Sequence, residues 1–146
     1  MENKTNHVTL HMDARSVNEG FSRMAVMAFM ADMDPTIEQL EDVKTAVSEA
    51  VTNAIIHGYQ DEKEQVELVL DRTGQKLVIQ VIDKGVGIAD IEEARRPFYT
   101  TKSHLERSGM GFAFMEAFMD ELIVFSEPGK GTRVVMTKYI EGRRGM

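Results

Sequence analysis

The sequence predicts an α+β domain, a two-layer sandwich of one mixed β-sheet with helices on one face. Three observations support this fold class. The expected elements follow the order strand, helix, helix, strand, strand, irregular segment, helix, strand, strand. Strands gather in the second half of the chain, and helices are few. Elements in this order form one sheet that buries one of its faces under a layer of helices.

The N-terminal half contains one expected strand and two expected helices. Alternation of apolar and polar residues predicts a half-buried strand over residues 7–13. Ser16 followed by Glu19 matches a capping box, so a helix is expected from there to about Met33. Pro35 favours the start of a second helix, whose end is marked by a cation and a glycine, His57-Gly58. Its apolar stripe consists of Ile37, Leu40, Val43, Val47, Ala50, Val51 and Ala54.

The C-terminal half contains two expected hairpins and two expected helices. Turn residues between apolar runs place the hairpin turns at 71–74 and 128–131. Their strands are expected over residues 65–70, 75–83, 121–126 and 132–140. Helices are expected over residues 90–96 and 109–120, and the rest of the segment 84–108 lacks long periodicity. We expect a single domain over residues 1–140 and a flexible tail over residues 141–146.

Length, charge and composition exclude several classes of function. With 146 residues, the chain has the size of one domain. It carries 17 basic and 24 acidic side chains, a net charge of −7, which argues against nucleic acid as a direct partner. The absence of cysteine excludes disulfides, thiolate metal sites and cysteine nucleophiles. No apolar run approaches the ~20 residues that span a bilayer, so a cytoplasmic protein without membrane contact is expected.

A first candidate site lies on the second helix, where Glu49 and Asn53 are four residues apart and share a face. A carboxylate and an amide at the rim of a core can accept a proton and hold a divalent metal ion. Taken alone, the pair is more typical of two solvated helix residues.

Two glycine-containing segments are further candidates. Asp83 follows a strand and is followed by Gly85 and Gly87, whose small size lets a ligand approach the backbone. The segment 108–111 opens a helix with free N–H groups, which attract anions. A tight turn and a flexible hinge are the simpler interpretations of each segment alone.

The order of these three signals resembles the N, G1 and G2 boxes of the ATPase and kinase superfamily that includes gyrase, histidine kinases and mismatch-repair ATPases. Longer stretches are similar to the anti-sigma F factors, serine kinases of sporulating bacteria, and the likeness runs from the first strand to about Ile140. These stretches are residues 48–59, 98–102 and 106–112. The resemblance implies a histidine-kinase-like ATPase fold, called the Bergerat fold.

The resemblance also implies a nucleotide site for ATP or ADP with Mg²⁺. Asn53 would hold the metal, Glu49 would be the catalytic base, and Asp83 would accept a hydrogen bond from the adenine amino group. A lid over residues 91–107 would cover the nucleotide, and Arg107 would report the γ-phosphate. The further nucleotide contacts would be Gly85, Gly87, Thr101, Lys102, Ser108, Gly109, Met110, Gly111 and Thr132. Lys84 stands where many relatives have an acid, and its side chain is expected to point outward.

Partner contacts are implied on the first helix. Glu19 and Arg23 would meet the sporulation sigma factor, and Arg23 would also meet the anti-anti-sigma protein that is phosphorylated on serine. The family forms homodimers, with the contact expected on the first strand and helix. Exposed apolar residues there are expected among Met24, Met27, Met30 and Met33.

Three alternatives remain at this point. The chain could be the ATP-binding half of a two-component histidine kinase, although no phospho-accepting segment precedes the boxes. It could be a nucleotide-binding adaptor without catalysis, although an adaptor would not need Glu49 as a catalytic base. It could also be a general-stress anti-sigma kinase, since these paralogues share the boxes.

Overall fold

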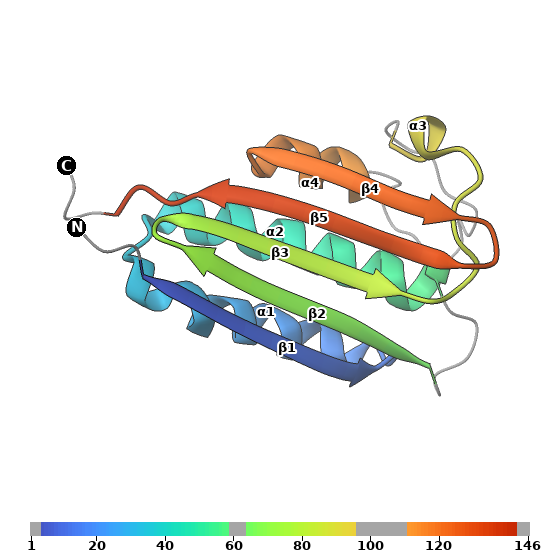
Figure 1. Cartoon of the computed structure of the whole chain (residues 1–146), viewed down its shortest axis with the longest axis horizontal. Helices are drawn as coiled ribbons and strands as arrows, with labels where there is room; N and C mark the ends of the chain where they lie inside the picture. The colour runs from blue at the N-terminus through green and yellow to red at the C-terminus, as the bar shows by residue number, and fades with distance from the viewer. Residues whose placement is uncertain (1–3, 59–63, 96–110, 143–146) are drawn as a thin grey trace.

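The computed structural model describes residues 4–58, 64–95 and 111–142 as one sheet covered by helices on one face (Figure 1). The helical segments are α1 (Val17–Met30), η1 (Ala31–Met33), α2 (Ile37–Asn53), η2 (Ala54–Gly58), α3 (Ile91–Ala94) and α4 (Gly111–Phe118). The strands are β1 (Thr5–Asp13), β2 (Gln65–Thr73), β3 (Lys76–Asp83), β4 (Glu121–Glu127) and β5 (Gly131–Tyr139). The predicted two-layer α+β fold is therefore confirmed.

The sheet has five strands in the order β1-β2-β3-β5-β4. All four of these pairings are antiparallel, so the prediction of a mixed sheet was wrong in this respect. Two hairpins pair β2 with β3 and β4 with β5. Between β1 and β2 the chain passes through two helices rather than one, which returns it to the end where β1 finished and makes β2 run back along β1 (Figure 1).

The second helix begins with a cap that differs from the predicted start. Thr36 accepts a hydrogen bond from the Gln39 N–H, and Gln39 Oε1 accepts one from the Thr36 N–H, both at 3.1 Å. This reciprocal capping box places Pro35 before the helix rather than inside it. The capping box predicted at Ser16 is not formed, because Ser16 already has helical dihedrals and its side chain makes no capping hydrogen bond.

The core lies between the sheet and the helices. The predicted stripe of α2 is confirmed for Val43, Val47, Ala50 and Val51, which are fully buried. The prediction was wrong for Ile37, which lies in the first turn of the helix and is 72% exposed. On α1 the buried residues are Ser22, Val26, Phe29 and Met30. Leu68, Leu70, Leu77, Ile79 and Met136 face the helices from the sheet, and Met115 of α4 belongs to the same core.

The outward face of α1 carries apolar side chains in place of charged ones. Val17, Phe21 and Met24 are 68%, 58% and 70% exposed and recur at the spacing of one helix face. Of the four methionines expected to be exposed, Met24 is exposed, whereas Met30 and Met33 belong to the core. Across the described ranges, no helix is long and apolar enough to cross a membrane.

Candidate functional site

Glu49 and Asn53 lie together at the C-terminal end of α2, against the first residue of α4. A Cβ atom placed on Gly111 would lie 2.9 Å from Asn53 Nδ2, 3.2 Å from Asn53 Oδ1 and 3.3 Å from Glu49 Oε2. The backbone at the start of α4 therefore rests directly on the two polar side chains. The structure thus brings together the first candidate segment and the end of the third.

The helix changes its winding immediately after Asn53. Residues 54–58 form a single π-helical stretch, η2, which contacts β3 and β5. Such stretches widen the backbone and are frequent at functional sites. Here the stretch places the end of α2 beside the two central strands, one of which carries Asp83.

Asp83 ends β3 with its side chain facing the helices, and it is only 6% exposed. Its Oδ1 accepts a hydrogen bond of 3.0 Å from the Gly85 N–H. Burial raises the pKa of Asp83 from 3.8 to about 6, while the backbone N–H groups of Gly85 and Thr132 act in the opposite direction. A buried carboxylate with this pKa is the kind of group that recognises a hydrogen-bond donor on a ligand.

Gly87 and Gly131 both have positive φ angles, +76° and +92°. A Cβ on Gly87 would overlap the Glu127 carbonyl, and one on Gly131 would overlap the backbone of Asp83 and Lys84. These two glycines let the loop after β3 pack against the β4–β5 turn, a requirement of the fold itself. Lys84 is exposed, as predicted.

Ser126 is a residue of this region that sequence reasoning missed. Its Oγ accepts a hydrogen bond of 2.7 Å from the Ile88 N–H, donates one of 3.0 Å to the Gly131 carbonyl, and lies 2.7 Å from Thr132 Oγ1. It therefore joins β4 and β5 to the loop after β3. Its register opposite Thr132 depends on strand pairing, so no local sequence pattern identifies it.

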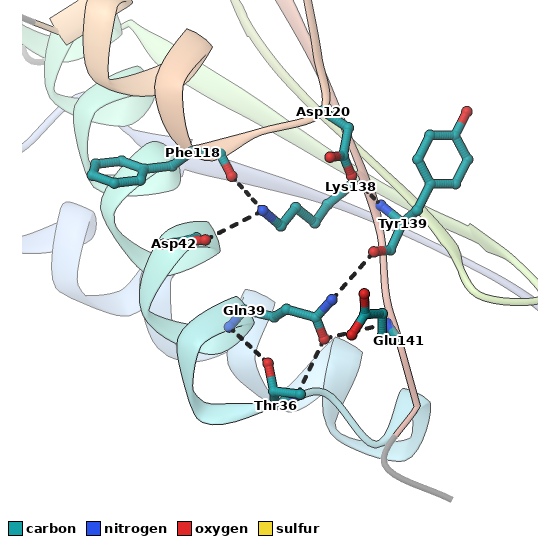
Figure 2. A network of polar contacts seen from close by, with 8 residues as sticks. All are labelled: Thr36, Gln39, Asp42, Phe118, Asp120, Lys138, Tyr139 and Glu141. Atoms are coloured by element: carbon teal, nitrogen blue, oxygen red, sulfur yellow. Dashed lines mark hydrogen bonds and ion pairs between the residues drawn. The ribbon is translucent and has the colours of Figure 1, made fainter. Parts of the chain in front are cut away.

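The position of α4 is fixed at its other end by a polar network (Figure 2). Lys138 Nζ donates to the carbonyl of Phe118, the last residue of α4, at 2.6 Å and lies 3.3 Å from Asp42 Oδ2 on α2. Gln39 donates from Nε2 to the Tyr139 carbonyl and accepts at Oε1 from the Glu141 N–H (Figure 2). The network ties α2, α4 and β5 together, so the start of α4 is held over Asn53.

The predicted partner residues form an ion pair on α1. Arg23 Nε lies 2.6 Å from Glu19 Oε2, and the two side chains are 40% and 23% exposed. At about 100° per residue, the pair lies on the opposite side of the helix from Phe21 and Met24. Six further predicted contacts lie outside the described residues: Thr101, Lys102, Arg107, Ser108, Gly109 and Met110.

The residues present fit a magnesium-bound nucleotide. Asn53 Oδ1 and the Glu49 carboxylate are hard oxygen donors beside a helix start, which suits Mg²⁺. Within the described parts of the chain, no group of three or more His, Asp or Glu side chains could hold a metal ion by itself. A cation at Asn53 would therefore take most of its ligands from phosphate oxygens and water.

Comparisons with known proteins identify the family of this chain. A family model described as a histidine kinase-like ATPase domain matches residues 12–138. The anti-sigma F factor of Clostridium perfringens (strain SM101) is 56% identical over 134 residues, which is 91% of this chain and 96% of that protein. The anti-sigma F factor of Thermoanaerobacter sp. (strain X514) is 54% identical over 93% of this chain and 95% of that protein.

A solved structure of the RsbU and RsbW domains of Rv1364c from Mycobacterium tuberculosis has a similar fold. It matches with a TM-score of 0.68 and 20% identity, covering 92% of this chain and 32% of that one. The family match spans both ends of the candidate site, and the two curated relatives align over nearly their whole length. This chain therefore belongs to the anti-sigma F factors, built on the histidine kinase-like ATPase domain.

Proposed function

We propose that this protein binds and inhibits a sporulation sigma factor and, as an ATP-dependent serine kinase, phosphorylates its anti-anti-sigma antagonist. The observation that carries the kinase part is the contact of Glu49 and Asn53 with the backbone of Gly111. It sets a proton acceptor and an amide ligand beside the start of a helix, where phosphate groups bind well. Family membership supports the sigma-binding part.

Glu49 is the proposed general base. In the transfer step, the serine oxygen of the antagonist forms a bond to the γ-phosphorus of ATP, and the bond from that phosphorus to the β–γ bridging oxygen breaks. ADP leaves, and the proton of the serine hydroxyl passes to the Glu49 carboxylate. Such proton acceptance contributes roughly 10²–10⁴-fold to the rate of a reaction.

Asn53 and Asp83 are proposed to bind the two ends of the nucleotide. Mg²⁺ at Asn53 would neutralise charge on the phosphates during transfer. The Asp83 carboxylate, held by the Gly85 N–H, accepts a hydrogen bond from the adenine amino group. Thr132 lies opposite Asp83 on β5 and completes the adenine end.

The expected lid over residues 91–107 is proposed to select the partner. Arg107 precedes Gly109 in the sequence, and we expect its guanidinium to contact the γ-phosphate, with Thr101 and Lys102 as further phosphate contacts. With ATP the protein would hold the sigma factor and phosphorylate the antagonist. With ADP it would retain the unphosphorylated antagonist in a stable complex. Equal affinities of each partner in ATP and ADP would contradict this role.

The first helix is the proposed partner surface, with Glu19 and Arg23 as contacts. A homodimer is proposed from the same region, because Val17, Phe21 and Met24 form an exposed apolar stripe on α1 beside the edge strand β1. A stripe of this kind is typical of a protein–protein contact.

The decisive experiment is incubation with labelled ATP, Mg²⁺ and a cognate anti-anti-sigma protein. We expect label on a serine of that partner and loss of at least about 100-fold in rate with Glu49→Gln, while nucleotide and sigma-factor binding persist. Glu41→Gln, an exposed change on the same helix, is the matched control.

Other outcomes of this experiment identify the alternatives. Label on a histidine of this chain would indicate a histidine kinase, and no label at all would indicate an adaptor without catalysis. Full transfer by Glu49→Gln would rule out the proposed base. Preference for a general-stress sigma factor over a sporulation one would assign the chain to that paralogue.

A further inference from the structure

Asp83, Thr132 and Ser126 lie in one row across three adjacent strands. Asp83 of β3 is the register partner of Thr132 of β5, and Thr132 is the register partner of Ser126 of β4. Directly opposite residues in antiparallel strands point to the same face of the sheet. Asp83 faces the helices, so all three side chains lie on the helix-covered face at the end of β3.

The hydroxyl protons in this row have a single consistent arrangement. Ser126 has one proton and two lone pairs, and its Oγ accepts from the Ile88 N–H. The Gly131 carbonyl, 3.0 Å away, can only accept, so the Ser126 proton goes to it. The remaining contact, 2.7 Å to Thr132 Oγ1, then requires Thr132 to be the donor. The opposite choice would leave two acceptor oxygens facing each other at 3.0 Å.

The hydroxyl of Thr132 therefore presents lone pairs alone to any further neighbour. Asp83 beside it is an acceptor as well when ionised. Together they form an acceptor-only wall at this end of the sheet.

We infer that Ser126 is a positioning residue that sets base specificity by keeping Thr132 an acceptor, so that the site takes a 6-amino purine and rejects a 6-oxo purine. This inference rests on the proposed placement of the base at Asp83. An exocyclic amino group donates to the wall, whereas a carbonyl oxygen at the same position faces two acceptors. Sites that pair a buried polar group discriminate strongly against analogues that leave it unpaired.

The test compares the affinity of the intact protein for ATP and for ITP, whose bases differ in the 6-amino and 6-oxo groups and in the proton that the 6-oxo base carries on N1. Wild type should bind ATP at least about 100-fold more tightly than ITP. Ser126→Ala frees the Thr132 proton, which can then turn to the 6-oxo group. We expect this variant to bind ITP more tightly than wild type does, and to lower the ATP-to-ITP ratio about tenfold, the size of one hydrogen bond gained.

Two further variants separate this role from a purely structural one. Thr132→Val removes the hydroxyl, so it should weaken ATP binding, and its gain in ITP binding should be smaller than that of Ser126→Ala because no proton is offered to the 6-oxo group. Ser22→Ala is the matched control, because Ser22 is a fully buried serine that donates to a backbone carbonyl on α1, away from the sheet edge. It should leave the ATP-to-ITP ratio unchanged. If Ser126→Ala fails to fold, Ser126→Cys, with its weaker donor and acceptor, should shift the ratio in the same direction.

The outcomes distinguish the inference from the proposed function. A wild type that binds ATP tightly, combined with a Ser126→Ala variant whose ATP-to-ITP ratio is unchanged, would overturn the role of Ser126 alone. A ratio that falls in Ser126→Ala only through weaker ATP binding would also overturn it. A folded wild type that binds neither nucleotide would overturn the proposed function together with this inference.

Discussion

The backbone of Gly111 lies directly on the side chain of Asn53, since a Cβ at Gly111 would be 2.9 Å from Asn53 Nδ2. The last residue of α2 and the first residue of α4 are thus in contact although they are far apart in the sequence. A site built on two packed helices is held more precisely than one built on loops. A methyl group at position 111 would enter the space that the Asn53 amide occupies.

Gly111→Ala should impair the nucleotide site while leaving the fold intact. The added methyl group must displace the ends of Asn53 and Glu49, and small misplacements of such groups cost about 100-fold in rate. Alanine also favours a helix over glycine by roughly 1 kcal/mol, so the free energy of unfolding should not fall by much. Phosphoryl transfer and thermal unfolding of the same preparation measure both effects.

Gly20→Ala is the control for this substitution. Gly20 is also a helical glycine, but its added Cβ would meet only the flexible end of Arg23, at 3.5 Å. Nucleotide binding and transfer by this variant should match wild type. Equal loss in both variants would show that glycine content, and not the contact with Asn53, is responsible.

Asp83 should make the folded protein less stable as pH rises from about 4 to about 6. Its pKa is about 6 in the folded state and about 3.9 in an unfolded chain, so the folded state holds more protons within that window. The free energy of unfolding then falls with rising pH, by up to ~3 kcal/mol from this group. Below the window the carboxyl is protonated in both states, and it imposes no such cost.

Asp83→Asn should remove this pH dependence, because the amide stays neutral and its oxygen can still accept from Gly85. Urea unfolding of wild type and variant at several pH values between 4 and 8 measures the effect. The stability of the variant relative to wild type should increase up to about pH 6 and then level off. A difference that is flat across this range would show that Asp83 is ionised as easily as in the unfolded chain.

Hydrophobic periodicity identifies most of the buried stripe of α2 but does not identify the buried side of α1, and the two helices show why. On α2 the apolar residues occupy one stripe, and Val43, Val47 and Ala50 are all buried. On α1 apolar residues occupy two opposite sides, so periodicity alone cannot tell which side faces the core. The buried side includes Ser22, whose hydroxyl donates to the Glu19 carbonyl 2.7 Å away and so avoids an unpaired polar group in the core.

The candidate site was predictable only where local motifs mark it. The segments around Asn53, Asp83 and Gly111 have spacings that can be recognised in the chain. Ser126 has none, because its contacts with Ile88 and Thr132 depend on the non-local pairing of β4 with β5. Strand order and register follow from packing of the whole sheet, which a single sequence does not state.

Arg23→Glu should abolish binding of the sigma factor and of the anti-anti-sigma protein if the first helix is their docking surface. Burying a mismatched charge in an interface costs several kcal/mol. The substitution places two acids four residues apart, which should lower the free energy of unfolding by only ~0.5 kcal/mol. ATP affinity should stay unchanged. Titration of each partner onto the immobilised protein measures the effect.

A double substitution tests whether the partner or the ion pair on α1 needs Arg23. Glu19→Arg combined with Arg23→Glu restores an ion pair within the helix but reverses the charges shown to a partner. Partner binding should remain lost in this variant. Recovery of binding would mean that binding needs only an ion pair between positions 19 and 23, which lie 2.6 Å apart through Glu19 Oε2 and Arg23 Nε in wild type. The partner would then dock elsewhere.

Lys138→Met should destabilise the protein and weaken the nucleotide site through α4. Lys138 Nζ is largely buried and donates to the Phe118 carbonyl at the C-terminal end of α4, where helix carbonyls lack partners within the helix. Methionine keeps the length of the side chain but leaves that carbonyl and the Asp42 carboxylate, 24% exposed, without the ammonium group. The expected loss is ~1–3 kcal/mol in the free energy of unfolding.

Lys44→Met is the matched control for this last substitution. Lys44 also lies within ion-pair distance of an acid, Glu41 at 2.9 Å, but both side chains are well exposed, and such surface pairs contribute less than about 1 kcal/mol. Urea unfolding should therefore separate the two variants, with Lys138→Met the less stable. Because α4 begins at Gly111, Lys138→Met should also weaken Mg²⁺-dependent ATP binding under conditions where it remains folded. Equal stability of the two variants, or normal nucleotide binding by Lys138→Met, would show that α4 is held in place by its apolar contacts alone.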